Sequence, residues 1–146
     1  MVSGYVVTQK DMEGKTDPSD SVALASYGVD DWPYAMFPLN GKIALNGGMY
    51  SMVCLDEAHR GIYKMPYRAI TPRKEEVENL LVPVCCSASH IAMTSIRMEP
   101  VWMMLGEAAG LAGALAVQEK TSVQGVSEVT LRTKLKERGQ ILERPA

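Results

Sequence analysis

A long, almost uninterrupted apolar stretch in the second half of the chain predicts a helix. From Val101 to Val117 every residue except Glu107 is apolar or small, as in a helix buried between protein layers. Pro100 suits the first turn of such a helix, because its missing N–H is harmless there, and Glu99 then takes the N-cap position. The stretch is at the lower length limit for a membrane span, but its alanines, its glycines and Glu107 favour a helix within a protein.

Small residues recur along this helix at three- and four-residue spacing, namely Gly106, Ala109, Gly110 and Gly113. Glycine inside a helix costs about 1 kcal/mol relative to alanine, so we expect this face to serve close packing. A second helix follows Ser127, a good N-cap, and ends before Gly139. Leu131 and Leu135 lie on one face of it, which predicts a covering helix.

The first half of the chain predicts strands and loops. Strands are expected where β-branched and apolar residues cluster, at Tyr5–Thr8, Val22–Val29, Met49–Leu55 and Ile62–Ile70. A surface loop is expected at Lys10–Asp20, irregular chain at Asp30–Gly48, and a charged turn or short helix at Arg73–Glu78. The Asp30–Gly48 stretch contains prolines and the turn-prone run at 46–48, so we predict an irregular excursion there.

The run Leu80–Val84 is apolar without alternation, which predicts a short strand covered on both faces, with Pro83 where its pairing ends. A polar loop and then the long helix follow. The fold class is therefore predicted as α/β, in the form of a mixed α+β fragment: strands of a sheet, a closing strand–loop–helix, and a C-terminal covering helix.

Composition excludes several classes of function. The 146 residues carry a net charge of −2 and are 47% apolar, so no basic surface for nucleic acid and no polybasic membrane signal is present. Three cysteines, two of them adjacent, form neither a disulfide framework nor a metal-ligand pattern, and no metal site is expected. The first residues lack the features of a signal peptide, so a cytoplasmic location is favoured.

Candidate chemistry gathers between the predicted strand and the long helix. A helix N-terminus carries unpaired N–H groups and a partial positive charge. Ser87, Ser89, Ser95 and Arg97 lie nearby in sequence. One interpretation is a cradle for a polar, partly anionic cofactor. The other is that the serines satisfy the loop backbone and that Arg97 pairs with an acid.

Three further features have two interpretations each. His90 is either an acid–base group or, more commonly for a single histidine, a structural hydrogen-bonding residue. Arg68 either binds a substrate carboxylate or forms an ordinary salt bridge. The adjacent Cys85 and Cys86 suit packing as buried thiols better than a redox role, and Trp102 is expected in the core.

These segments resemble the C-terminal part of FAD-dependent oxidoreductases, in particular the xanthan-lyase-like flavoproteins of bacteria. The resemblance rests on an ordered set of segments, which are 67–72, 78–85, 87–90, 95–100, 105–109 and 139–142, with 5–9, 26–27 and 30 upstream.

The resemblance implies a position for the cofactor. In that family the chain returns from a substrate-binding sheet into the FAD domain through a strand, a loop and a helix whose N-terminus faces the flavin. By this resemblance the flavin neighbours are Ser87, Ala88, Ser89, Ser95, Arg97 and Met98. Arg68 and His90 are the candidate substrate-binding residues, on the chemistry of their own side chains.

The chain also departs from the family pattern. Thr94 stands where the family has a glycine before Ser-Ile-Arg, and Trp32 stands where a histidine is common. The family's strand–GxGxxG–helix, which grips the FAD pyrophosphate, does not occur in the sequence.

We therefore expect a C-terminal fragment of an FAD oxidoreductase. Residues 1–78 would end a substrate-binding domain, 79–120 would close the FAD-binding domain, and 121–146 would form the covering helix and tail. Its expected partners are a small-molecule substrate and a missing N-terminal FAD-binding half, without which it is expected to be inactive. Neither nucleic acid nor membrane is expected as a partner. The alternative is a non-enzymatic α/β scaffold or interaction domain without a cofactor.

Overall fold

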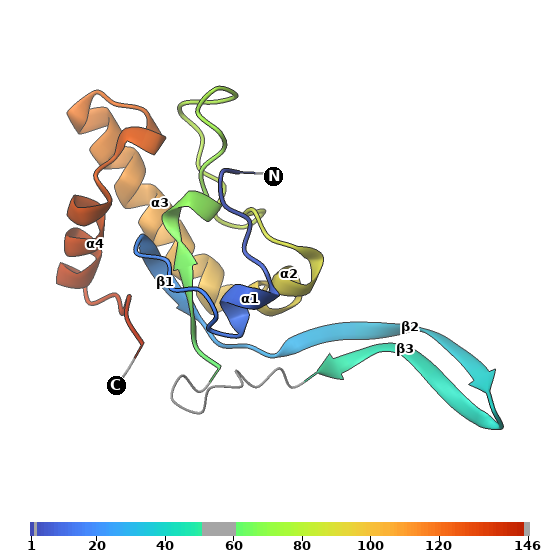
Figure 1. Ribbon diagram of the computed structural model, residues 1–146. Coiled ribbons are helices and arrows are strands. Elements are labelled where there is room, and N and C mark those ends of the chain that lie inside the picture. The colour runs from blue at the N-terminus through green and yellow to red at the C-terminus, as the bar shows by residue number, and fades with distance from the viewer. Residues whose placement is uncertain (2, 51–60, 145–146) are drawn as a thin grey trace.

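The computed structural model describes residues 1, 3–50 and 61–144. Within them the elements follow in the order α1 (Gln9–Met12), β1 (Ser21–Ala25), β2 (Val29–Leu39), β3 (Lys42–Tyr50), β4 (Tyr63–Pro66), the 3₁₀ turn η2 (Tyr67–Ala69), α2 (His90–Ile96), α3 (Glu99–Glu119), the 3₁₀ turn η3 (Val123–Gly125) and α4 (Glu128–Glu137). This is a mixed α+β arrangement, which confirms the fold class predicted from the sequence (Figure 1).

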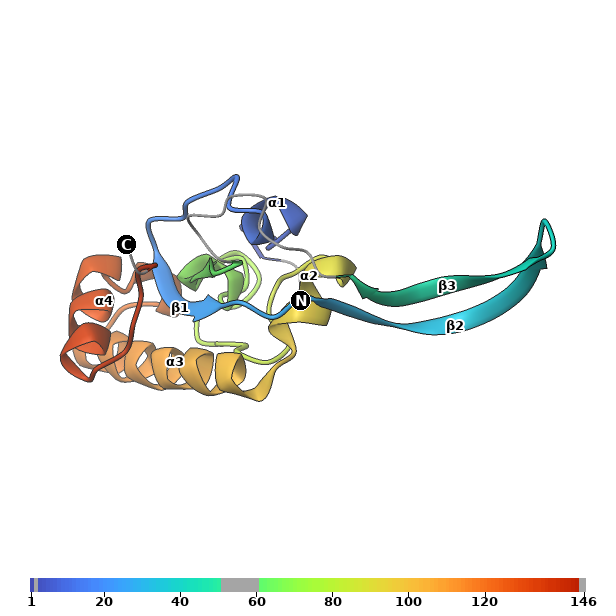
Figure 2. The same ribbon diagram turned by 90° about the horizontal axis from the view of Figure 1, so that it is seen from below.

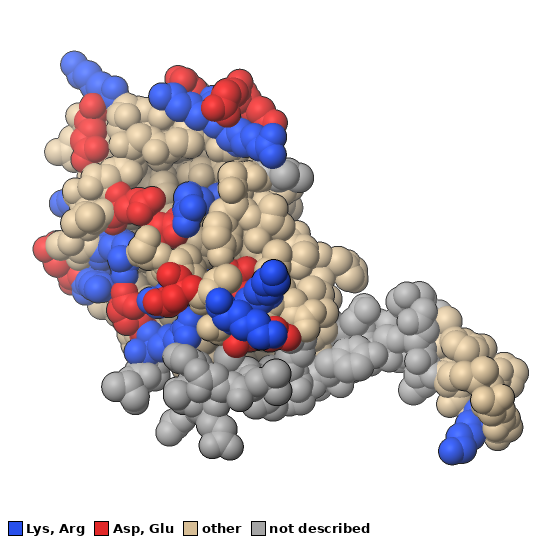
Figure 3. All heavy atoms as spheres, viewed as in Figure 1, with Lys and Arg blue, Asp and Glu red and all other residues tan. Residues whose placement is uncertain are grey.

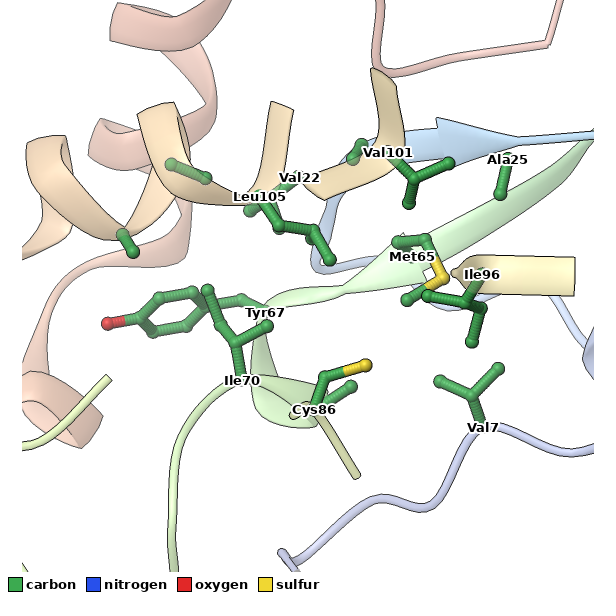
Figure 4. Packing of buried hydrophobic residues seen from close by; sticks show 14 of the residues in the cluster. Val7, Val22, Ala25, Met65, Tyr67, Ile70, Cys86, Ile96, Val101 and Leu105 are labelled. Atoms are coloured by element: carbon green, nitrogen blue, oxygen red, sulfur yellow. The ribbon is translucent and has the colours of Figure 1, made fainter. Parts of the chain in front are cut away.

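The core lies between a two-stranded sheet and the helices. β1 and β4 pair antiparallel, with Ala23 opposite Met65. α3 packs on β1, and α4 packs on both α3 and β1. Figure 4 shows buried side chains from β1, β4, α2 and α3, among them Val22 and Ile96, pointing toward one another. Fully burying an aliphatic side chain of this size contributes about 1.5–3 kcal/mol, so these contacts hold the layers together.

The C-terminal helix forms where the sequence predicts it. The Ser127 side chain accepts a hydrogen bond from the Thr130 backbone N–H at 3.3 Å, which caps α4. Leu131 and Leu135 are fully buried on its inner face. Gly139 adopts a φ of 89° just beyond the helix, a conformation that favours glycine. The prediction of a covering helix is confirmed.

The long helix is confirmed as well, with one difference at its start. α3 begins at Glu99, and Met98, which makes no side-chain cap bond, takes the N-cap position that we expected for Glu99. Its length and composition would allow a membrane span, but α3 packs on β1 and α4.

The glycines of α3 do not serve close packing within the described residues, contrary to expectation. A Cβ built at Gly106 or Gly110 meets no atom within 4 Å, and one at Gly113 meets only the Leu81 side chain, at 4.0 Å. The buried face of the helix instead comprises Val101, Leu105, Ala108, Ala109, Ala112, Leu115 and Ala116.

Residues 29–50 form a β-hairpin, so the prediction of an irregular excursion at Asp30–Gly48 is wrong. β2 and β3 pair antiparallel and project from the body as an arm (Figures 1 and 2). Asn40 and Gly41 have φ values of 51° and 72°, as a two-residue hairpin turn of type I′ requires. Pro38 lies opposite Ile43, and a ribbon with free edges tolerates a strand proline.

Leu80–Val84 is not a strand. Leu80 and Val84 are exposed, and the segment contacts the body through a hydrogen bond from the Val82 N–H to the Ile70 carbonyl at 2.8 Å. Periodicity cannot distinguish a buried strand from an apolar loop of this length, and Pro83 removes a ladder donor. The predicted strand–loop–helix is therefore a loop, the short helix α2 and α3.

The other predicted strands are shorter than expected. Val22–Val29 contributes β1 and the first residue of β2, and Ile62–Ile70 contains β4 followed by η2. The described part of Met49–Leu55 is the end of β3, and the rest lies outside the described residues. The turn at Arg73–Glu78 is confirmed by a hydrogen bond from the Glu76 N–H to the Arg73 carbonyl.

The N-terminal segments differ from their predictions too. Tyr5–Thr8 forms a single bridge between Val7 and Ala88 and then enters α1. Asp11 and Asp20, in the predicted surface loop, are buried. Hydrogen bonds compensate this burial, since Asp11 accepts bonds from the Thr8 N–H at 2.7 Å and from the Tyr5 and Thr16 hydroxyls.

Candidate functional site

The loop before α2 is held in place by backbone hydrogen bonds to two other segments. The Val7 N–H donates to the Ser87 carbonyl at 3.0 Å, and the Ser89 N–H donates to the Val7 carbonyl at 2.8 Å. The Ser87 N–H donates to the Ala69 carbonyl at 2.7 Å. The backbone around Ala88 is therefore held in place by two other segments, as the residues of a binding site require.

Two of the predicted serines face the protein interior. The Ser87 hydroxyl accepts a hydrogen bond from the Ser3 N–H at 3.1 Å, and Ser87 is buried. Ser95, also buried, donates its hydroxyl proton to the Tyr27 carbonyl, so the Tyr63 hydroxyl, 2.7 Å away, must donate to Ser95. Both serines have the structural role that was the second interpretation of the sequence.

Ser89 begins a helix that the sequence analysis missed. Its hydroxyl accepts a hydrogen bond from the Ala92 N–H at 3.3 Å, which caps α2. The signal was present in the sequence, because a serine ahead of the apolar residues Ile91, Ala92 and Met93 is a common N-terminal pattern. The helix ends at Ile96, and Arg97 is its C-cap residue.

Three of the predicted residues share an open hollow of about 480 Å³. Ala88, His90 and Arg97 line it from the loop and from the two ends of α2. Its remaining lining residues are Met1, Val84, Cys85, Cys86, Met93 and Trp102. Arg97 is exposed, with its guanidinium carbon 6.0 Å from the centre of the Tyr27 ring. The hollow thus combines apolar surface, an imidazole and a fixed positive charge, which suits a flat, partly polar ligand.

Trp102 is a lining residue that sequence reasoning had placed in the core. Its ring borders the hollow from the first turn of α3, while its Nε1 is buried and has no hydrogen-bond partner among the described residues. A buried donor without a partner costs about 1–3 kcal/mol. The sequence did hold a signal for this exposed position, because Trp102 comes two residues after Pro100, at the start of a helix beside a polar loop.

The N-terminus of α3 offers fewer free backbone N–H groups to a ligand than we expected from the sequence. Pro100 has no N–H, and the N–H groups of Val101 and Trp102 both donate to the Met98 carbonyl, at 3.0 and 3.3 Å. The acidic Glu99 lies in the first turn. A negatively charged ligand group would therefore meet a carboxylate and few unused donors there, whereas Arg97 supplies positive charge close by.

Arg68 lies on a different hollow, of about 330 Å³, which shares no lining residue with the first. Its guanidinium contacts both carboxylate oxygens of Asp20, from Nε at 2.9 Å and from Nη2 at 3.1 Å. Burial alone would raise the pKa of Asp20, but the hydrogen bonds and charge of Arg68 outweigh it and lower that pKa. The guanidinium also lies 5.0 Å from the Tyr5 ring centre.

The adjacent cysteines differ from each other. Cys85 is exposed, contrary to the prediction of two buried thiols, whereas Cys86 is buried and its pKa is raised to about 11 by that burial. Both are free. The described residues contain no group of histidine, cysteine and acidic side chains that would hold a metal ion.

Figure 3 shows acidic and basic side chains interspersed over the body, while the far end of the β2–β3 arm is uncharged except for basic atoms at its tip. Lys42 is the charged residue of that part of the sequence. No single-sign patch on this face marks a nucleic-acid site.

Comparison with known families gives one finding. The model of the FAD dependent oxidoreductase family matches residues 1–137. Neither the curated proteins nor the solved structures gave a match.

Proposed function

Because the chain belongs to the FAD-dependent oxidoreductase family, we propose that the hollow beside α2 and α3 is one wall of a flavin site. The observation that carries the proposal is the convergence of Ala88, His90 and Arg97 with the ring of Trp102 around one hollow. Membership in the family implies FAD as the cofactor. More specifically, we propose that this chain is the C-terminal part of a xanthan-lyase-like flavoprotein, because the ordered segments described in the sequence resemble that group.

The lining residues fit the ring system of a flavin better than its phosphates. Trp102 offers an aromatic ring at the wall of the hollow. The hollow falls within the roughly 300–1,000 Å³ usual for small-molecule sites. The sequence has no GxGxxG, so we propose that a dinucleotide-binding unit outside these 146 residues holds the pyrophosphate.

FAD held at this hollow would supply hydride-transfer chemistry toward a small organic substrate. Arg97 would place positive charge at the edge of the hollow, where it favours negative charge on a bound ligand. His90, which is exposed on the same hollow, would donate or accept a proton toward the substrate. Ser87 and Ser95 position the loop and α2 through their buried hydrogen bonds rather than by touching the ligand.

Flavin binding can be measured through Trp102. The chain has two tryptophans, so in a Trp32→Phe variant the fluorescence reports Trp102 alone. We expect riboflavin to quench it with a Kd of roughly 0.1–1 mM, equivalent to about 4–5.5 kcal/mol. We expect FAD to bind no more than a few-fold more tightly, because this wall lacks a phosphate grip.

Two variants distinguish binding at this hollow from binding elsewhere on the protein. Arg97→Ala should weaken riboflavin quenching, whereas Arg68→Ala, on the other hollow, should leave it unchanged. Absence of saturable quenching with either ligand would refute the flavin wall. Stoichiometric FAD with an affinity at least a hundredfold above that of riboflavin would refute the need for an external phosphate-binding unit.

A further inference from the structure

The far half of the β2–β3 arm is apolar on both faces and uncovered within the described residues. Residues 34–39 of β2 are apolar without alternation, as in a strand that is covered on both sides. Phe37 and Leu39, on one face, are 45% and 54% exposed, whereas Met36 and Ile43, on the other, are 71% and 76% exposed. Figures 1 and 2 show no other described helix or strand beside this half of the arm. A two-stranded ribbon is marginally stable by itself in water, so this pattern indicates burial against another body.

The two edges of the arm differ in the backbone groups that they offer. In a hairpin with a two-residue turn, the pair next to the turn, Leu39 and Lys42, is the hydrogen-bonded kind, and the two kinds of pair alternate from there. The N–H groups of Met36 and Ile43 therefore point outward, away from the other strand. Pro38 takes the next outward position of β2 and has no N–H, whereas β3 contains no proline. The outer edge of β3 can thus add a further strand, and the outer edge of β2 is interrupted.

These features favour a folded protein partner over a membrane or a second arm. The core of a bilayer does not accept the unpaired backbone groups of an open sheet edge. Two arms joined along β3 would pair these edges with each other, but the resulting four-stranded sheet would still have two uncovered apolar faces. A folded partner that adds a strand to β3 pairs the edge and can also cover both faces with its own apolar side chains.

The base of the arm lies beside the proposed flavin wall. β2 contacts α2, and the Ser95 hydroxyl of α2 donates a hydrogen bond to the Tyr27 carbonyl, two residues before β2. His90, at the other end of α2, lines the hollow. A unit that held the FAD pyrophosphate at this hollow would therefore lie next to the arm. Building on the proposed function, we propose that the arm joins this chain to its GxGxxG-containing half, a strand of which pairs with the outer edge of β3.

The proposal is tested by hydrogen exchange of the arm with and without such a half. The GxGxxG-containing N-terminal part of a full-length family member is fused ahead of Met1, and exchange in this fusion is compared by mass spectrometry with exchange in the 146-residue chain alone. We expect residues 36–44 to exchange at least about tenfold more slowly in the fusion, because added strand pairing protects their amides. In the chain alone we expect fast exchange of these residues at every protein concentration.

Two proline variants of the fusion test which edge is used. Met36→Pro and Ile43→Pro each remove one outward N–H and one exposed apolar side chain from the same face, so the matched pair differs in the edge that is changed. Ile43→Pro should remove most of the protection gained in the fusion, because it deletes a donor from the edge of β3. Met36→Pro should keep that protection within about threefold, because the edge of β2 has no added strand to lose.

The flavin absorption of the purified fusion separates this proposal from the proposed function. A fusion that binds FAD while its arm exchanges as fast as in the chain alone would overturn the arm contact and leave the flavin wall intact. A protected arm without bound FAD would support the arm contact and count against the flavin wall, and a fusion with neither would count against both. Equal losses in the two proline variants would also overturn the proposal. Protection of the arm in the chain alone would do so too, in favour of a second copy if it rises with protein concentration, or of a membrane if it requires phosphatidylglycerol vesicles.

Discussion

The ion pair of Asp20 and Arg68 offers the sharpest test of the fold. Asp20 is buried, with 1% of its surface exposed, and its carboxylate also accepts a hydrogen bond from the Arg68 backbone N–H at 3.1 Å. Its own carbonyl accepts one from the Tyr67 N–H at 2.8 Å. The pair thus ties the segment before β1 to the turn after β4. The substitution Asp20→Asn keeps the shape of the side chain and removes its charge.

The expected loss of stability follows from the geometry. Breaking a fully buried ion pair costs about 3–5 kcal/mol, because the remaining charge is stranded. The Arg68 side chain is 49% exposed, so water can hydrate it once Asp20 is neutral, and the cost falls to about 1–3 kcal/mol. A loss of 2 kcal/mol in a chain of this size lowers the melting temperature by about 4–8 °C.

Urea denaturation of Asp20→Asn, Arg68→Gln and the double variant measures the coupling between the two residues. We expect the double variant to be no less stable than Asp20→Asn, within about 0.5 kcal/mol, since each single change already breaks the pair. Asp17→Asn is the control, because Asp17 is an exposed acid in the same segment and should cost well under 1 kcal/mol.

The pH dependence gives an independent check. Arg68 lowers the pKa of Asp20 below its ordinary value, so the ionised carboxylate stabilises the folded state above that value. The advantage of the wild type over Asp20→Asn should be complete above about pH 5 and should shrink as the pH falls through the lowered pKa. Additive losses in the double variant, or an advantage that grows in acid, would refute the reasoning.

Four further outcomes are expected. Ser127→Ala should cost about 1 kcal/mol of folding free energy, measured by urea denaturation, because α4 loses its N-cap. Gly139→Ala should lower the melting temperature, because its φ is positive, whereas Gly106→Ala should raise it by replacing glycine in an open helix position, each change corresponding to about 1 kcal/mol. In the native protein a maleimide should label Cys85 rapidly and Cys86 slowly, as peptide mass spectrometry would show, since burial holds the Cys86 thiol protonated.

The elements that the sequence predicted well are those fixed by local chemistry. α4 has its cap, its two buried leucines and its terminal glycine within thirteen residues, from Ser127 to Gly139. No distant contact is needed to place such an element. The start of α3 was wrong by one residue because Pro100 is acceptable at either of the first two helical positions.

The hairpin and the loop at Leu80–Val84 were predicted wrongly for a tertiary reason. Pro38 signals a break only if its strand is central, and whether a strand has a free edge depends on the whole sheet. An apolar run such as Leu80–Val84 likewise reads as a strand unless its lack of a strand partner is known. The signal for the hairpin was the Asn40-Gly41 pair, whose turn geometry is local.

For the candidate site, the sequence indicated which residues are close along the chain, but not which of them face the same surface. Ala88, His90 and Arg97 do meet at one hollow, but Ser87 and Ser95 turn inward. Adjacent residues in a loop and a short helix point in different directions, and the choice depends on partners more than thirty residues away, such as Tyr63 for Ser95. Exposure can be assigned only once those partners are in place.

The glycines of α3 illustrate the same dependence on the rest of the fold. Periodicity correctly places Gly106, Gly110 and Gly113 along one side of a helix, and it cannot say what lies against them. In this chain the larger residues Val101 and Leu105 occupy the inner face, because filling the core with aliphatic side chains stabilises the fold more than a close approach of backbones does. The glycines are thereby left on the outer face, where their helix cost has no compensation within the described residues.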